Sequence, residues 1–456
     1  MLALMAAALL SAAPCGTVAV PESGAADLRL VTCGNGVSAV VDARPGSGTV
    51  LIRVGVRVGS RDEPLELAGI SHLLEHLLFK EGHGEGARRN PAFRSLREAG
   101  GLVNATTDFE MTEYHADLPA ERFAQGWAAL VTMVTGTAFD ATDLAREREV
   151  VLQEAAMGKT DPLAIMAYSV LRQVFPDDPL GQPVIGFRST LRRIKKEDVA
   201  AYHRRHYVPG KMFAVIVGDV DAQDAVTRVT ETLGSLPASG AAEAPYPDPE
   251  PHREEAFEFR TLVSQAYLLT VALTRGERSQ DAPALDLLAT LLGEGRSSRL
   301  HRRLVDREGL SDQILAVSFQ VSNTGAFGAG VAVDPDRAAQ ARMALREEMD
   351  RLAREPVSAE ELSVARAVLK GRAAAQFETN AGIADFRTRR LLYGQDVSRE
   401  AHEETLARLT PDDLRDTAAR TWGGGSAPEP TAIEVLPARG FGKVVAALKY
   451  LFFRRL

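Results

Sequence analysis

The chain has 456 residues, of which 45% are hydrophobic and 25% are charged, and its formal net charge is -8. This composition is typical of a globular protein and excludes a disordered, collagen-like or low-complexity chain. The acidic balance argues against nucleic-acid binding by phosphate neutralisation. Only Cys15 and Cys33 are cysteines, which excludes a disulfide-rich scaffold and a cysteine-rich zinc site. Because single cores stop growing at roughly 250–300 residues, we expect at least two domains.

An apolar stretch rich in alanine and leucine, MLALMAAALLSAA, opens the chain. It resembles the apolar region of a secretory signal, although no basic residue precedes it. We therefore predict a signal segment over residues 1–20 and a periplasmic or secreted location. A plain N-terminal helix, a mis-set start and a cytoplasmic location are the alternatives. No apolar run reaches the roughly 18–20 residues that a membrane span needs.

A linker is predicted over residues 236–253, LPASGAAEAPYPDPEPHR, which are rich in proline, alanine and acids and lack periodicity. It separates residues 25–235 from residues 254–437. Both parts show the same order, an alternating strand, an apolar-periodic helix and later a charged helix. These elements are strands over 47–58 and 264–273 and helices over 67–79, 143–157, 282–292 and 338–354. The pattern predicts an α+β fold of two similar domains, each a mostly antiparallel sheet packed with helices.

The last segment, residues 438–456, is apolar and basic. As an amphipathic helix it would bind a membrane surface or a partner protein. A helix docked on its own domain is the alternative, because apolar positions at a chain end are also used for packing.

The string His72-Leu-Leu-Glu75-His76 lies in a segment of helix-forming residues without proline. Positions four apart share one helix face, so both imidazoles can reach one point, and Glu75 lies on the same side. Two histidines at this spacing are typical zinc ligands, and the glutamate is placed to act on water. The alternative is a packed or solvated histidine pair. Leucines flank the motif, which predicts burial, and buried polar groups need a partner such as a metal ion.

A third ligand is expected in the helix over 143–157, where Glu147 and Glu154 are seven residues, or two turns, apart. Either carboxylate can complete the zinc site, and the other would then orient a ligand histidine. The alternative is an acidic, solvated helix face.

Longer stretches resemble the pitrilysin / mitochondrial processing peptidase family of zinc peptidases with the inverted motif. The resemblance covers roughly residues 28–437. The segments that carry it are GSRDEPLELAGISHLLEHLLFKEG, GGLVNATTDFEMTEYHADLP, EREVVLQE, PLGQPVIGFRSTLRRI, AYHRRHYVPGKMFAVIVGDVD and LLGEGRSSRLHRRLVDREGL.

The resemblance implies one Zn²⁺ per chain, bound by His72, His76 and Glu154. It makes Glu75 the general base and Glu147 the residue that orients a ligand. The implied activity is zinc-dependent cleavage of extended or unfolded peptides.

The resemblance also places Asn104 and Ala105 at a strand edge that lines the substrate cleft, where a peptide would add as a further strand. A turn after two glycines is the alternative for Asn104. His203 and His206, which come before a strand, are predicted to be packing or surface residues without a metal.

One departure concerns an arginine and a tyrosine that grip the substrate carbonyl in active single-chain relatives. Val305 and Asp312 stand at these positions, and neither can donate a hydrogen bond to an oxyanion at neutral pH. Our hypothesis is that this chain is the zinc-bearing subunit of a heterodimer whose partner supplies the pair. The alternatives are a local shift that brings in Arg302, Arg303 or Arg307, a homodimer, or a non-catalytic scaffold subunit.

Overall fold

The computed structural model describes two compact units, each with one sheet and its own apolar core. This confirms the predicted α+β fold of two sheet-and-helix domains. The described residues are 15–79, 91–136, 139–158, 168, 170–238, 246–247, 256–261, 263–311, 313–424 and 430–438. Unit 1 draws on Met1–Ala155, Pro183–Pro245 and Gln376–Ala401, and unit 2 on Ala156–Gln182, Tyr246–Ala375 and His402–Leu456.

Unit 1 contains a seven-stranded sheet in the order β1-β2-β3-β7-β4-β6-β5. All neighbouring strands are antiparallel except β3 and β7, which are parallel. The strands are β1 (Gly16–Ala19), β2 (Asp27–Thr32), β3 (Ser38–Ala43), β4 (Thr49–Val56), β5 (Leu102–Thr107), β6 (Thr112–Pro119) and β7 (Met212–Gly218). Strand β5 is therefore an edge strand, paired with β6 alone among the described strands.

Helices cover both faces of this sheet. On β4, Ile52 and Val54 belong to the core that includes α1 and α3, whereas Leu51 packs in a separate cluster with α12. A strand covered on both faces is buried at nearly every position, as β4 is after Thr49. The helices of unit 1 are α1 (Ile70–Phe79), α2 (Pro91–Glu98), α3 (Phe123–Thr135), α4 (Ala141–Gly158), α6 (Arg188–Leu191), α7 (Lys196–His206), α8 (Ala222–Glu231) and α12 (Asn380–Leu392).

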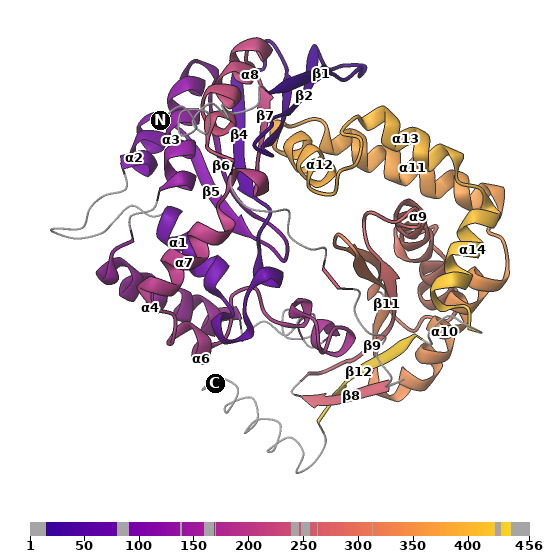
Figure 1. The fold of residues 1–456 in the computed structure, drawn as a ribbon. Helices are drawn as coiled ribbons and strands as arrows, with labels where there is room; N and C mark the ends of the chain where they lie inside the picture. Colours follow the sequence, from indigo (N-terminus) through magenta and orange to yellow (C-terminus); the bar gives the residue numbers. More distant parts are fainter. Residues whose placement is uncertain are drawn as a thin grey trace, which may run out of the picture. The chain divides into compact units, whose positions relative to one another are not determined.

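Helix α12 departs from the predicted domain boundaries, because residues 376–401 belong to unit 1 and not to the predicted domain 254–437. It packs against β7 and β4 (Figure 1). The buried guanidinium of Arg53, in the middle of β4, donates to Asp385 at 2.7 Å and to Thr388 at 2.9 Å on this helix. Dividing the sequence once, at the linker, cannot reveal that a later segment packs back onto the first unit.

A second buried arginine holds the same helix. Arg387 is fully buried and contacts Glu22 at 2.5 Å and Asp42 at 2.8 Å, and both carboxylates are also buried. Breaking a buried pair leaves an uncompensated charge, so these contacts specify where α12 docks.

The predicted signal segment over residues 1–20 overlaps the sheet of unit 1. Strand β1 pairs with β2, with Gly16 opposite Thr32, and this register places Cys15 opposite Cys33. The two cysteines form a disulfide. A signal segment over residues 1–20 would include β1 and Cys15, so these predicted bounds overlap folded parts of unit 1. Residues 1–14 lie outside the described part.

Unit 2 contains a five-stranded sheet in the order β10-β11-β9-β12-β8, antiparallel except for the parallel pair β12 and β8. Trp422 is buried in its core, where it stacks on Phe327 with ring centroids 4.6 Å apart and donates to the Met349 carbonyl at 3.0 Å. Its elements are β8 (Ala256–Thr261), β9 (Ala266–Arg275), β10 (Gln313–Gln320), β11 (Thr324–Val333), β12 (Thr431–Pro437), α9 (Ala282–Gly293), α10 (Ala338–Arg354), α11 (Ala359–Gln376) and α14 (Pro411–Trp422). Helix α13 (Arg399–Arg408) has residues in both units.

Within the described part of the chain, no helix is both long and apolar enough to cross a membrane. The predicted amphipathic tail over 438–456 lies outside the described residues except for Ala438, and so does most of the predicted linker over 236–253.

Candidate metal centre

Two histidines project from one face of α1, as their spacing predicts. The side chains of His72 and His76 are 13% and 15% exposed, and their ring centroids are 4.7 Å apart. Burial lowers the pKa of His72 to about 4, and the neighbouring His76 adds to this effect. The His72 ring is therefore neutral at pH 7 and can offer a nitrogen lone pair, which is the form that binds metals.

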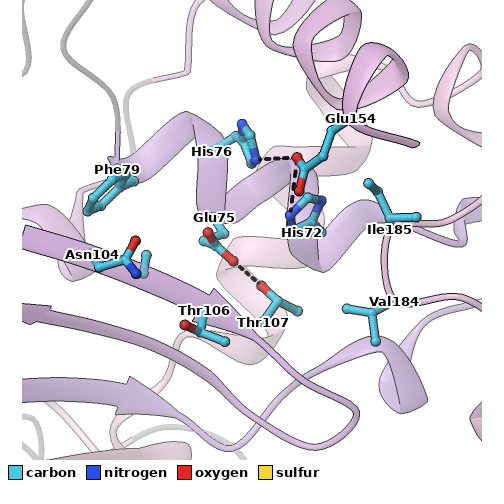
Figure 2. A pocket seen from close by; sticks show the side chains of 11 residues that line it. His72, Glu75, His76, Phe79, Asn104, Thr106, Thr107, Glu154, Val184 and Ile185 are labelled. Carbon is cyan, nitrogen blue, oxygen red and sulfur yellow. Dashed lines mark hydrogen bonds and ion pairs between the residues drawn. The ribbon is translucent and has the colours of Figure 1, made fainter. Parts of the chain in front are cut away.

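The carboxylate of Glu154 on α4 reaches both rings (Figure 2). Its Oε2 atom lies 3.9 Å from Nε2 of His72 and 3.5 Å from Nε2 of His76. These distances are too long for good hydrogen bonds. They are close to the separation of about 3.3 Å that tetrahedral ligands at zinc bond lengths have from one another. The residues therefore fit a metal ion bound by two imidazoles and one carboxylate.

Glu147 lies on α4, two turns before Glu154, and its side chain faces Nδ1 of His76. It is buried, and its Oε2 atom is 3.6 Å from Nδ1 of His76. Neither this nitrogen nor Nδ1 of His72 has a hydrogen-bond partner within 3.5 Å. A small approach would let His76 donate to Glu147, which would direct Nε2 toward Glu154. The helix itself is held by Arg148, which donates to the carbonyls of Leu191 and Ile194.

Glu75 lies on the same face of α1, and ligand atoms of His72, Glu75 and His76 all lie within 4.8 Å of one another. Thr107, at the end of β5, donates its hydroxyl to Oε2 of Glu75 at 2.6 Å. Burial raises the pKa of Glu75, and the Thr107 hydroxyl opposes this rise. Because one Glu75 oxygen accepts this bond while Glu154 faces both Nε2 atoms, Glu154 is better placed as the third ligand.

A cavity of about 560 Å³ opens beside these groups. Strand β5 forms one wall, and Asn104 and Ala105 are among its lining residues. Figure 2 shows Asn104 at this wall. The structure places Asn104 within the edge strand and not in a turn. The complete lining is His72, Glu75, His76, Phe79, Asn104, Ala105, Thr106, Thr107, Glu154, Val184 and Ile185.

Sequence reasoning did not identify Thr107, Val184 or Ile185 as parts of this site. The sequence could have indicated Thr107, because side chains alternate along a strand. This alternation puts Thr107 on the same face of β5 as Val103 and Ala105, which pack against the core. Nothing local indicates Val184 and Ile185, which reach the cavity only through the fold.

His203 and His206 are not among the residues that line this cavity. His203 and His206 are buried on α7, and His203 stacks on Tyr207 with ring centroids 4.6 Å apart. Both are packing residues, as predicted. Val305 lies in a π-helix over His301–Arg307 of unit 2, whereas Asp312 lies outside the described residues.

Two imidazoles and a carboxylate that converge beside a second glutamate, next to the edge strand of the described sheet, are the arrangement of a metallopeptidase. The chain belongs to peptidase family M16. The model of the insulinase family (peptidase family M16) matches residues 39–187, which contain the whole centre, and the model of the peptidase M16 inactive domain matches residues 193–369.

Similar proteins support this assignment. A protein from Mycobacterium leprae, named an uncharacterized zinc protease, is 30% identical over 75% of this chain and 77% of its own length. A protein of the same description from Streptomyces coelicolor is 27% identical over 88% and 89%. The fold is shared with a protease from Helicobacter pylori, at a TM-score of 0.78 and 21% identity, over 90% of this chain and 99% of that one. A peptidase M16 inactive domain from Pseudomonas fluorescens gives a TM-score of 0.80 at 16% identity, over 91% and 98%.

Proposed function

We propose that the protein is a zinc-dependent endopeptidase that cleaves extended or unfolded peptides. The observation that carries this proposal is the convergence of His72, His76 and Glu154 at ligand spacing, with Glu75 beside them. The relatives named zinc proteases support the choice of metal. When bound, zinc supplies Lewis-acid activation of water and of the substrate carbonyl.

Residues of the chain bind the peptide, transfer the proton and orient the metal ligands. An extended peptide pairs with β5 at Asn104 and Ala105, on the edge that no other described strand occupies, and this pairing holds its carbonyl beside the centre. Glu75 accepts a proton from the attacking water on the oxygen that Thr107 does not occupy, and later passes it to the leaving amine. Glu147 holds the His76 ring in place.

We further propose that this chain is the catalytic subunit of a heterodimer, whose partner supplies the arginine and tyrosine that Val305 and Asp312 replace. Two of the arginines that could substitute are engaged within unit 2. Arg302 donates to Glu361 at 3.1 Å. Arg303 is held by three acids, Glu308, Glu347 and Glu348. Redirecting Arg303 would break three ion pairs at once. Redirecting Arg302 would leave Glu361 paired, among the described residues, with Arg299 alone.

The test is cleavage of an unstructured fluorogenic peptide by the homogeneous, zinc-loaded chain, with and without an added family subunit that has the arginine and tyrosine. Because a missing oxyanion donor typically costs about 10²–10³ in turnover, we expect the partner to raise the rate by that factor. Fast cleavage by the chain alone would contradict the two-subunit proposal. Zinc binding without cleavage in either case would favour the scaffold role.

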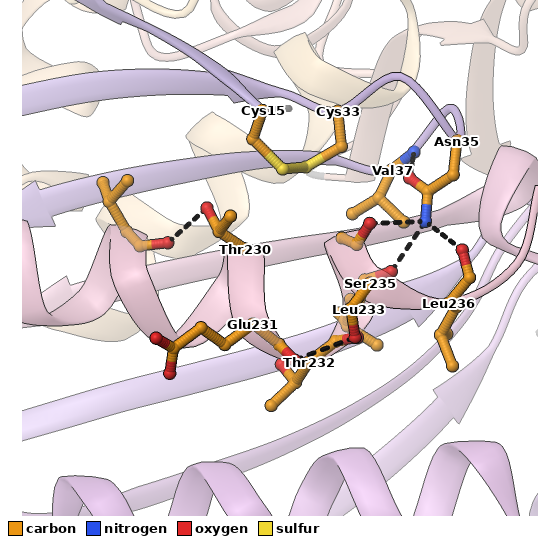
Figure 3. Close-up of a disulfide and its surroundings, with 12 residues drawn as sticks. Cys15, Cys33, Asn35, Val37, Thr230, Glu231, Thr232, Leu233, Ser235 and Leu236 are labelled. Carbon is orange, nitrogen blue, oxygen red and sulfur yellow. Dashed lines mark hydrogen bonds between the residues drawn. A yellow bond between two sulfur atoms is a disulfide. The ribbon is translucent and has the colours of Figure 1, made fainter. Parts of the chain in front are cut away.

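We also propose that the mature protein is located in the periplasm or outside the cell. The Cys15–Cys33 disulfide supports this location, because such bonds persist in oxidising compartments. Figure 3 shows the bond beside Asn35, whose side-chain amide donates to the carbonyls of Leu233 and Leu236 at 2.8 and 2.9 Å. These hydrogen bonds therefore hold the loop after Cys33 against residues 233–236, which follow α8.

Reduction of this disulfide is expected to release β1 from the sheet. All four residues of β1 are exposed, so little apolar burial holds the strand once the covalent bond is lost. Amide hydrogen exchange of residues 16–19, measured with and without reductant, tests this expectation. The Cys15→Ser variant should behave like the reduced protein. Equal protection in both redox states would show that pairing with β2 is sufficient.

A further inference from the structure

The buried side chain of Glu63, which precedes helix α1, accepts hydrogen bonds from backbone N–H groups at the start of this helix. Oε2 of Glu63 accepts the Gly69 N–H at 2.6 Å, and Oε1 accepts the Ser71 N–H at 2.8 Å. Amides at the start of a helix have no partner within the helix, so this side chain satisfies two of them at once. Burial raises the pKa of Glu63 to about 8, and the hydrogen bonds from the Gly69 and Ser71 N–H groups oppose this rise.

The same turn of α1 is tied to a second helix. The Ser71 hydroxyl lies 2.8 Å from the Tyr202 hydroxyl of α7 and donates to the Gly59 carbonyl at 3.1 Å. All of these groups are buried, so their hydrogen bonds do not compete with water.

Packing leaves the helix start no room to move. Gly69 has φ +94°, and a Cβ at this position would lie 2.7 Å from the Ile185 carbonyl oxygen and 2.9 Å from Cα of Gly186. The start of α1 is therefore held by Glu63 on one side and by backbone on the other.

The loop that contains Glu63 also holds the hairpin of β5 and β6. Arg61 pairs with Glu110 at 2.7 Å, and both side chains are buried. The Ser60 N–H donates to the Asp108 carbonyl at 3.1 Å in the same turn. Residues 59–63 thus fix α1 relative to the hairpin that carries Thr107, the hydrogen-bond donor to Glu75.

We propose that Glu63 is a positioning residue of the metal centre, which sets the rotation and height of α1 so that its two imidazoles meet Glu154. His72 directly follows Ser71, which Glu63 holds. One residue of slippage in a helix is a rotation of about 100° and a rise of about 1.5 Å, enough to separate the ligands. The proposal rests on the proposed function, in that the centre binds zinc.

The experiment uses Glu63→Gln in the full chain and measures zinc affinity by competition with a chromophoric chelator. The carboxamide oxygen can accept one N–H, but its amino group faces the other donor. Loss of groups that orient metal ligands typically weakens binding 10–100-fold, and we expect a loss in this range. In peptide cleavage, kcat should fall while KM stays unchanged, because the edge of β5 is intact.

Two control variants separate positioning from a general loss of stability. Glu66→Gln makes the same substitution at an exposed glutamate, and Val229→Ala makes a cavity in the core under α8. Both should keep wild-type zinc affinity. If Glu63→Gln binds zinc no more weakly than Val229→Ala at a comparable loss of Tm in the metal-free protein, the proposal is wrong.

Other outcomes are also decisive. If the wild-type chain itself does not bind zinc, the proposed function fails and not only the role of Glu63. If Glu63→Gln does not fold, Ser71→Ala removes the hydroxyl bonds to Tyr202 and Gly59 and leaves the backbone intact. Weakened zinc binding by this variant would support the positioning network, and unchanged binding would overturn it.

Discussion

The Glu75→Gln variant is expected to bind zinc as the wild-type chain does and to lose about 10²–10⁴-fold in kcat, the usual contribution of a general base. The amide has the same size and can still accept the Thr107 hydroxyl bond, so the neighbouring ligands keep their places. It cannot take up a proton at neutral pH. Zinc content and single-turnover cleavage of an unstructured peptide measure the two effects separately.

Thr107→Val is the matched comparison for this variant. It removes the hydroxyl that contacts Glu75 but leaves the carboxylate in place, so its effect on kcat should be smaller than that of Glu75→Gln. Wild-type turnover by a zinc-loaded Glu75→Gln protein would exclude the assignment of the base.

The parts of the site that sequence could predict are those fixed by helix geometry. A spacing of four residues brings His72 and His76 to one face of α1, and a spacing of seven does the same for Glu147 and Glu154 on α4. These relations hold in any helix, so no knowledge of the fold is needed. Which of the two glutamates meets the Nε2 atoms depends on how α4 crosses α1, and only the family resemblance favoured Glu154.

The parts that sequence could not predict depend on contacts between distant segments. In the sequence, Arg53 is a single charged residue within an apolar strand. Its partner, Asp385, follows more than 300 residues later and is brought to it only by the fold. The Cys15–Cys33 bond depends on the register of β1 against β2, and β1 is too short and exposed to be recognised as a strand. The chain passes from unit 1 to unit 2 after Pro245, within the predicted linker, but the return of residues 376–401 to unit 1 was missed for the same reason, since α12 covers a sheet formed by the first half of the chain.

The last prediction distinguishes the two glutamates of α4. Glu154→Ala removes a ligand atom, so we expect the purified variant to lose its zinc on dialysis, as measured by elemental analysis. Glu147→Ala removes only the contact with Nδ1 of His76, so this variant should retain zinc but bind it 10–100-fold more weakly. Glu149→Ala, an exposed position on the same helix, serves as the control for the loss of one acid and should bind zinc normally.

The difference in exposure makes the comparison informative. Glu154 is 45% exposed and faces the cavity, whereas Glu147 is 6% exposed, so an effect of burial alone would be larger for Glu147. Loss of zinc from Glu154→Ala but not from Glu147→Ala can therefore be explained only by ligand geometry. The reverse result would exchange the two roles, and it would mean that α4 is rotated in solution so that Glu147 meets the imidazoles.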